Sequence, residues 1–408
     1  MVFCLRRGRR SRVCKKAAAA SLFALLEAHR QGDPDEVKGH LPRATSGTLQ
    51  WMSPPRRGRR RSVRRWRLVF VAAVVLLTLL VAVLSRASTP STASSETSSS
   101  SSSTSTSSTV PLSAERAVGL ITLRIAVPAT IESGSQSLLT TVRYPAIGSP
   151  GGSPVAGATP LRRVGGYPLV VFSQGFALAP TTYARLLNAW AAAGFVAAAP
   201  AYSFTSPNSP DGLERTDIVH HPAELSHVIT TLLVNNARPR GTLAGLIDRR
   251  EIGVAGHSDG GDVSLATAAN TCCLDRRVKA AVILSGAELS WFGGRYFSTP
   301  ALPLLVVQGT DDTINPISCS IQLYDQASRP KYYLSMRGQD HLSAYLPAGP
   351  PFNVVRRVTI DFLNAYLRDS SSSLAALTKA GSVAGLATIT SKASIAPVGG
   401  TCPDAPIG

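Results

Sequence analysis

The stretch EIGVAGHSDGGDVSLATAA, residues 251–269, restricts the possible fold of this chain more than any other segment. Its first six residues are typical of a buried strand, and its last ten have the small side chains of a closely packed helix. Between them, Gly-His-Ser-Asp-Gly at 256–260 matches G-x-S-x-G, the sharp strand-to-helix turn that lifts a serine hydroxyl above the edge of a sheet. Glycines beside the serine keep side chains away from the turned backbone. Ser258 is therefore a candidate nucleophile.

The region around this turn, from about 114 to 369, alternates short apolar runs with helical patterns. This alternation predicts a mostly parallel sheet with helices on both faces, opened by an antiparallel hairpin of 117–129 and 137–146. The other predicted strands are 167–175, 195–202, 251–258, 278–286, 303–312 and 331–338. The predicted helices are 181–193, 221–235, 260–270, 317–328 and 352–368.

The basic charge of the chain gathers at its N-terminus. Residues 1–67 hold 18 basic and 4 acidic side chains, so they carry most of the net charge of +18. A strongly basic balance indicates nucleic acid or a membrane surface as a partner only where the charge is clustered. We therefore predict a basic, cytoplasmic and largely disordered N-terminal segment, and no nucleic-acid binding by the main domain.

An uncharged apolar run, 68–84, follows the basic segment and has the minimum length for a membrane-spanning helix. The arginines before it would stay in the cytoplasm, which places the residues after Arg86 outside. Small residues around Arg86 also fit a cleavage site, so a cleaved secretory signal is the alternative to an uncleaved signal-anchor. Met52 is an alternative start of the chain. Both the signal-anchor and the cleaved signal place the main domain outside the cytoplasm, as a membrane-anchored or a secreted protein.

Two segments of low complexity flank the main domain, 114–369. Residues 87–113 are almost entirely Ser and Thr, which predicts a flexible linker, because such a segment buries too little apolar surface to fold. Residues 370–408 form a tail rich in Ser, Ala and Gly. Within the main domain, only 16 residues separate the strands at 278–286 and 303–312, too few for a large lid domain.

A serine hydroxyl needs a base and an orienting acid before it becomes a good nucleophile. Asp311 and Asp312 follow the next-to-last predicted strand, and His341 follows the last one. This chain order, Ser then Asp then His, is the one that the G-x-S-x-G architecture uses. We predict a triad of Ser258, His341 and Asp312, and prefer Asp312 over its neighbour Asp311 as the acid.

Two backbone N–H groups are candidates for the oxyanion hole that such a triad requires. One belongs to Asp259, at the N-terminus of the helix after the serine, and the other to Phe176, in the loop after the strand 167–175. The side chains of His257 and Asp259 diverge from the serine on so tight a turn. We therefore do not expect them to act as its base or acid.

The motifs FSQGF, GFVAAAP, GHSDGG, GTDDTINP and DH, spread over about 120–368, resemble the α/β-hydrolase superfamily. Within it the chain is similar to polyesterase-like cutinases, chlorophyllase-like and dienelactone-hydrolase-like enzymes. This resemblance implies an α/β-hydrolase fold, and Phe176 and Trp291 as aromatic residues that flank the substrate. The alternative is that both are partly buried loop aromatics. Gln174 departs from the pattern, because relatives often carry histidine there.

Four cysteines follow the apolar run: Cys272, Cys273, Cys319 and Cys402. An oxidising compartment would allow two disulfides. Because adjacent cysteines do not easily bond each other, we expect Cys272 and Cys273 to pair with Cys319 and Cys402 and to tether the tail. No spacing indicates a zinc site, and we predict neither a metal nor a cofactor.

The sequence predicts an extracytoplasmic serine hydrolase that cleaves a small-molecule or polymeric carboxylic ester. A peptidase or amidase with the same triad is one alternative, and a non-catalytic surface binding domain on the same fold is another. The oligomeric state stays open.

Overall fold

The computed structural model describes most of the chain beyond the Ser/Thr-rich segment. The described residues are 115–207, 209, 212–396 and 402. The predicted basic segment 1–67, the apolar run 68–84 and the linker 87–113 lie outside them. In the described part of the chain, no helix is long and apolar enough to cross a membrane.

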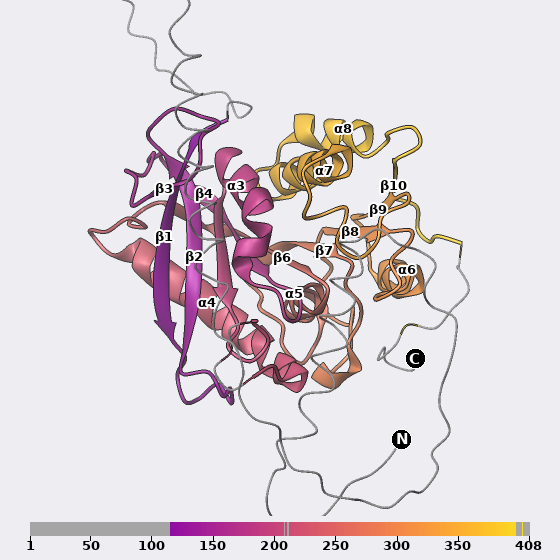
Figure 1. The fold of residues 1–408 in the computed structure, drawn as a ribbon, viewed down its shortest axis with the longest axis horizontal. Coiled ribbons are helices and arrows are strands. Elements are labelled where there is room, and N and C mark those ends of the chain that lie inside the picture. Colours follow the sequence, from indigo (N-terminus) through magenta and orange to yellow (C-terminus); the bar gives the residue numbers. More distant parts are fainter. Residues whose placement is uncertain (1–114, 208, 210–211, 397–401, 403–408) are drawn as a thin grey trace, which may run out of the picture. The chain divides into compact units, whose positions relative to one another are not determined.

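Ten strands of the described chain form one sheet, in the order β10-β9-β8-β7-β6-β4-β5-β2-β1-β3 (Figure 1). The strands are β1 (Ala117–Ala126), β2 (Ser137–Ala146), β3 (Val155–Ala156), β4 (Tyr167–Ser173), β5 (Val196–Ala201), β6 (Ile247–His257), β7 (Val278–Leu284), β8 (Leu304–Gly309), β9 (Lys331–Met336) and β10 (Ala387–Thr390). From β5 through β9 neighbouring strands are parallel, whereas β1 and β2 form an antiparallel hairpin. The predicted mostly parallel sheet with an N-terminal hairpin is confirmed.

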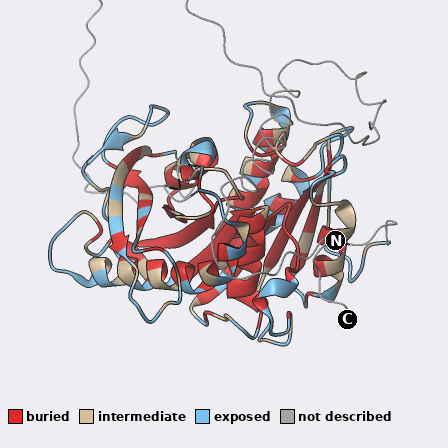
Figure 2. Cartoon of the chain, turned by 60° about the horizontal axis from the view of Figure 1, so that its bottom comes forward, coloured by how far each residue is buried: buried red, intermediate tan, exposed pale blue. Residues whose placement is uncertain are grey.

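Helices cover both faces of this sheet. The helices are α3 (Ala184–Ala192), α4 (His221–Ala237), α5 (Asp259–Ala269), α6 (Ile317–Gln326), α7 (Pro350–Leu367) and α8 (Ser371–Ala380). One buried core joins the sheet to α4, α5 and α6, and a second joins it to α3, α7 and α8. In β4, Leu169 faces the first core and Val170 the second, because successive side chains of a strand point to opposite faces. Figure 2 shows the buried residues concentrated in the strands and in the helices packed on them.

This double covering explains why the sequence pattern was informative. A strand buried on both faces has a continuous apolar run instead of alternating polar residues. All seven residues of β4 and all six of β8 are buried, and both strands stand out in the sequence as such runs. The predicted helices and strands accordingly lie within a few residues of the observed ones.

Two elements in the segment predicted as a tail, 370–408, were not anticipated. The side chain of Ser370 accepts a hydrogen bond from the backbone N–H of Ser373 and caps α8, and Leu377 of α8 is fully buried. The four-residue strand β10 pairs with β9 in the antiparallel direction. A short strand of this kind forms only where a neighbouring strand edge is available, so local composition does not reveal it.

The predicted pairing of the cysteines was wrong. Cys272 bonds its neighbour Cys273 in the turn after α5, and Cys319 bonds Cys402. The prediction assumed that adjacent cysteines do not easily bond each other, but the structure joins these two. Cys319 lies on α6, which Lys392 and Ile395 of the tail contact, so Cys402 is its available partner. The tail is therefore tethered, though not by the expected partners.

Hydrogen bonds trace the path of the tail along α6. The Tyr324 hydroxyl donates to the carbonyl oxygen of Lys392 at 2.6 Å, and the backbone N–H of Ile395 donates to the Asp325 carboxylate at 2.9 Å. These contacts hold Lys392 and Ile395 against the C-terminal end of α6, the helix that carries Cys319.

Loss of the Cys319–Cys402 bond should destabilise the domain, because this bond closes a loop with a sequence separation of 83. We expect the double variant Cys319→Ser/Cys402→Ser to lose about 2–4 kcal/mol of unfolding free energy in denaturant titrations followed by circular dichroism. The matched control is Cys272→Ser/Cys273→Ser, which opens a ring of two adjacent residues and should lose less. Equal losses in the two variants would contradict the loop-closure argument.

Candidate active site

The predicted site residues lie at one edge of the sheet. Phe176 follows β4, Ser258 follows β6, Asp312 follows β8 and His341 follows β9. These four strands are parallel, so their carboxyl ends meet at the same edge. In open α/β sheets this edge is where ligands bind.

Ser258 occupies a strained turn between β6 and α5. Its backbone has φ 55° and ψ −129°, a conformation that residues with a side chain rarely adopt. A Cβ on Gly256 would overlap the carbonyl oxygen of Gly260, and a Cβ on Gly260 would overlap that of Ser173. Both glycines are therefore required by close backbone contacts, as the G-x-S-x-G pattern predicts.

Asp312 and His341 form a buried pair. The Nδ1–H of His341 donates to Asp312 Oδ2 at 2.8 Å, and the other oxygen, Oδ1, accepts from the backbone N–H groups of Ile314 and Asn315. Since a carboxylate only accepts hydrogen bonds, the proton of the neutral imidazole lies on Nδ1, and Nε2 is its basic nitrogen.

The surroundings of Asp312 keep it ionised. Burial alone would raise the pKa of the Asp312 carboxyl, but the hydrogen bond and charge of His341, together with the Asn315 N–H, hold this pKa below its ordinary value. Asp311 instead is exposed and accepts a hydrogen bond from the Thr310 hydroxyl at 2.7 Å. Of the two aspartates, Asp312 is the one that contacts the histidine.

Ser258 is joined to the histidine loop through its neighbour. The hydroxyl of Ser258 makes no hydrogen bond to another described residue, whereas its backbone N–H donates to the carbonyl oxygen of Leu284 at 2.9 Å. Nε2 of His257 donates to the backbone oxygen of His341 at 2.7 Å, and the two imidazole rings are 4.7 Å apart. In substrate-free enzymes the bond between nucleophile and base is often long and shortens in the complex.

His257 is a fully buried, neutral side chain. Its Nε2 faces a carbonyl oxygen and must carry the proton, so Nδ1 accepts from the Tyr183 hydroxyl at 2.9 Å. Burial, and after it the proximity of His341, lowers the pKa of His257 to about 3. With both nitrogens engaged, its ring orders the site and has no nitrogen left to serve as a base.

Tyr183 was missed by the sequence analysis. Its hydroxyl oxygen accepts a hydrogen bond from the backbone N–H of Gly175 at 3.1 Å while donating to His257. Through this one hydroxyl the loop after β4 is fixed to the turn that carries the serine. Nothing in the local sequence around Tyr183 signals this role, because its partners lie far away along the chain.

The backbone N–H groups of Phe176 and Asp259, both at this junction, have no partner among the described residues. The loop after β4 contacts the start of α5, since a Cβ on Gly260 would lie 2.5 Å from the carbonyl oxygen of Gln174. Gln174 itself is buried and donates through Nε2 to the hydroxyl of Ser206, which fixes the loop on its other side.

The two aromatic residues differ in exposure. Phe176 is half-buried in the loop after β4. Trp291, in the 3-10 helix η3 (Ser290–Phe292), is 39% exposed, and the Arg215 guanidinium lies 5.2 Å from the centre of its ring. Residues 285–303, all of which the structure describes, hold only this one short element between β7 and β8.

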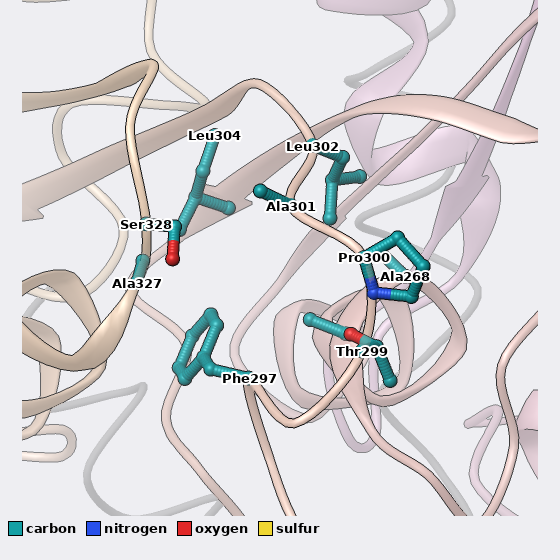
Figure 3. A pocket seen from close by; sticks show the side chains of 10 residues that line it. Ala268, Phe297, Thr299, Pro300, Ala301, Leu302, Leu304, Ala327 and Ser328 are labelled. Atoms are coloured by element: carbon teal, nitrogen blue, oxygen red, sulfur yellow. The ribbon is translucent and has the colours of Figure 1, made fainter.

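A small hollow elsewhere on the molecule does not belong to this site. The side chains of Phe297, Thr299 and Leu302 surround it (Figure 3), and its volume of about 10 Å³ leaves room for one water molecule. It contacts Ala268, at the end of α5, and Leu304, the first residue of β8. These positions are at the amino edge of the sheet, opposite Ser258.

A comparison with protein families agrees with the fold. The chlorophyllase family model matches residues 134–285, a segment that includes Phe176 and Ser258 and ends before Asp312. No curated protein matches the chain. The match and the sheet topology confirm the predicted α/β-hydrolase fold and the resemblance to chlorophyllase-like enzymes, which indicates a hydrolase of esters.

Tyr183→Phe should destabilise the domain, because it leaves Nδ1 of His257 and the Gly175 N–H buried without partners. We expect a loss of about 1–3 kcal/mol of unfolding free energy and faster amide hydrogen exchange at Gly175. The control is Tyr366→Phe, which removes a hydroxyl that hydrogen-bonds the partly buried hydroxyl of Tyr332. A loss no larger than that of the control would show that the Tyr183 hydroxyl does not hold the loop.

Proposed function

We propose that this protein is a serine hydrolase that cleaves carboxylic esters outside the cytoplasm through an acyl-enzyme intermediate. The observation that carries the proposal is the buried hydrogen bond between His341 and Asp312 at the sheet edge where the turn exposes Ser258. That bond leaves a basic Nε2 on the histidine, which is what a serine nucleophile requires.

In the proposed reaction the Ser258 oxygen attacks the ester carbonyl while Nε2 of His341 takes its proton. Asp312 holds the imidazole in the correct tautomer and stabilises the imidazolium that forms. The N–H groups of Phe176 and Asp259 donate to the oxyanion, assisted by the N-terminus of α5. His341 then gives the proton to the leaving alcohol, and water releases the acyl group by the same steps.

The substrate is a small-molecule or polymeric ester, and Phe176 and Trp291 flank its acyl or aromatic part. The half-exposed position of Trp291 in a short loop element supports this assignment. The small size of the segment between β7 and β8 favours esters over amides, because amide cleavage usually takes place in a more enclosed site. The catalytic groups are protein side chains and backbone amides, so the proposed reaction uses no cofactor.

The location outside the cytoplasm rests on the sequence of the N-terminal region. The apolar run 68–84 with arginines before it supports a signal-anchor or a cleaved signal. The disulfides Cys272–Cys273 and Cys319–Cys402 fit an oxidising compartment.

Substitutions in the triad test the reaction. Ser258→Ala should abolish both hydrolysis of p-nitrophenyl esters and labelling by a fluorophosphonate probe, with little change in melting temperature. Asp312→Asn should lower kcat by about 10³–10⁴, because the histidine then adopts the wrong tautomer.

The matched control for the acid is Asp311→Asn. It changes the neighbouring carboxylate, which does not contact the histidine, so kcat should change little. Turnover at the wild-type level in Ser258→Ala would refute the proposed reaction. A larger loss of kcat in Asp311→Asn than in Asp312→Asn would show that Asp311, and not Asp312, is the acid of the triad.

Protease treatment of intact cells tests the location. If the domain is anchored outside, added protease should remove it from the surface while a cytoplasmic marker survives. If the signal is cleaved, the domain should be in the medium with a mature N-terminus at Ser88, which N-terminal sequencing identifies. A domain that is digested only after lysis would contradict both forms.

A further inference from the structure

The residue after the nucleophile is an unusual neighbour for an oxyanion. Asp259 is the first residue of α5, and its side chain is buried, with the residue only 5% exposed. Its backbone N–H is one of the two donors that the proposed function assigns to the oxyanion. A carboxylate so close to developing negative charge opposes that charge unless a cation compensates it, and burial strengthens the effect.

Arg215 supplies that cation. Nε of Arg215 donates to Asp259 Oδ2 at 2.9 Å, and Nη2 donates to Oδ1 at 2.7 Å, so the guanidinium meets both carboxylate oxygens at once. This two-point geometry is specific to arginine, because lysine offers a point charge without the planar fork. Arg215 begins the 3-10 helix η2 (Arg215–His220), in the segment between β5 and α4.

The same guanidinium contacts a second part of the site. Its central carbon lies 5.2 Å from the centre of the Trp291 ring, which is the arrangement of a cation–π contact. Arg215 therefore joins three segments that are separate in the sequence: its own helix η2, the first residue of α5, and η3 with the exposed indole.

We propose that Arg215 is a positioning residue of the ester-cleaving site, with two separable effects. It neutralises the Asp259 carboxylate beside the oxyanion donors, and it holds the Trp291 ring at the rim where the substrate would lie. The proposal rests on the proposed function. The first effect stabilises the transition state, so its loss should lower kcat. The second supports contact with the substrate, so its loss should raise KM.

The two effects predict different responses to removal of the Asp259 charge. In Arg215→Gln the Asp259 carboxylate stays buried without the guanidinium, so kcat should fall by about 10- to 100-fold. This fall is smaller than the one expected when a direct oxyanion donor is removed. In Arg215→Gln/Asp259→Asn the Asp259 charge is removed as well, so most of the lost kcat should return. The indole still lacks its partner in the double variant, so the change in KM should persist.

The experiment is a double-mutant cycle of wild type, Arg215→Gln, Asp259→Asn and the double variant. Each protein is measured with p-nitrophenyl benzoate, whose ring can contact Trp291, and with p-nitrophenyl acetate as the matched small substrate. We expect kcat to be rescued in the double variant with both esters, and KM to stay raised about three- to tenfold for the benzoate alone, a modest loss of ground-state contact.

Arg215→Lys gives a second measure should Arg215→Gln fail to fold. This variant keeps the positive charge and loses the two-point hydrogen bonding, so its kcat should fall less than that of Arg215→Gln. If Arg215→Gln does not fold, the kcat of Arg215→Lys should remain within about tenfold of wild type. Thermal melts of every variant separate loss of fold from loss of rate.

The outcomes distinguish the two proposals. An active wild type whose double variant is no faster than Arg215→Gln shows a merely structural role and overturns the positioning role. An equal fall of kcat in Arg215→Lys and Arg215→Gln overturns it as well. A folded wild type that hydrolyses no ester and takes up no fluorophosphonate overturns the proposed function, and the positioning role with it.

Discussion

The neutral imidazole of His257 links the parts of this site that the chain supplies from distant positions. One nitrogen donates to the backbone of His341, and the other accepts from Tyr183, whose oxygen in turn accepts from Gly175. A protonated imidazole would need two acceptors, and the tyrosine would lose its role as a donor. Because burial holds its pKa well below the ordinary value, His257 stays neutral near neutral pH and keeps joining His341, the Ser258 turn and the loop after β4.

Much of the fold could be predicted because the central strands are buried on both faces. Their continuous apolar runs and the helical patterns between them locate nearly all the elements of the main domain. The triad was predicted because Ser258, Asp312 and His341 follow one another in the order that the G-x-S-x-G architecture uses, and the structure brings the last two into contact. The sequence analysis preferred Asp312 to Asp311, and the geometry agrees, because Asp312 is the one that contacts His341.

What the sequence could not predict depends on contacts between residues far apart along the chain. Tyr183 lies in a predicted helix and Arg215 between predicted elements, and only the folded chain shows that each joins separate segments. The disulfide pairing failed for a similar reason, because the path of the tail along α6 decides the partner of Cys319. Local patterns fix elements and their order, whereas these roles arise from where the loops meet.

The ends of the sheet have a consequence for how copies of this molecule behave together. The outermost strands of the described chain are short, with two residues in β3 and four in β10, and β10 lies between the longer β9 and solvent. An open strand edge is a template on which a strand of another molecule can add, and brief edge strands are a common protection against it. By pairing with residues 333–336 of β9, the tethered C-terminal segment leaves little of that edge free for a strand of another molecule.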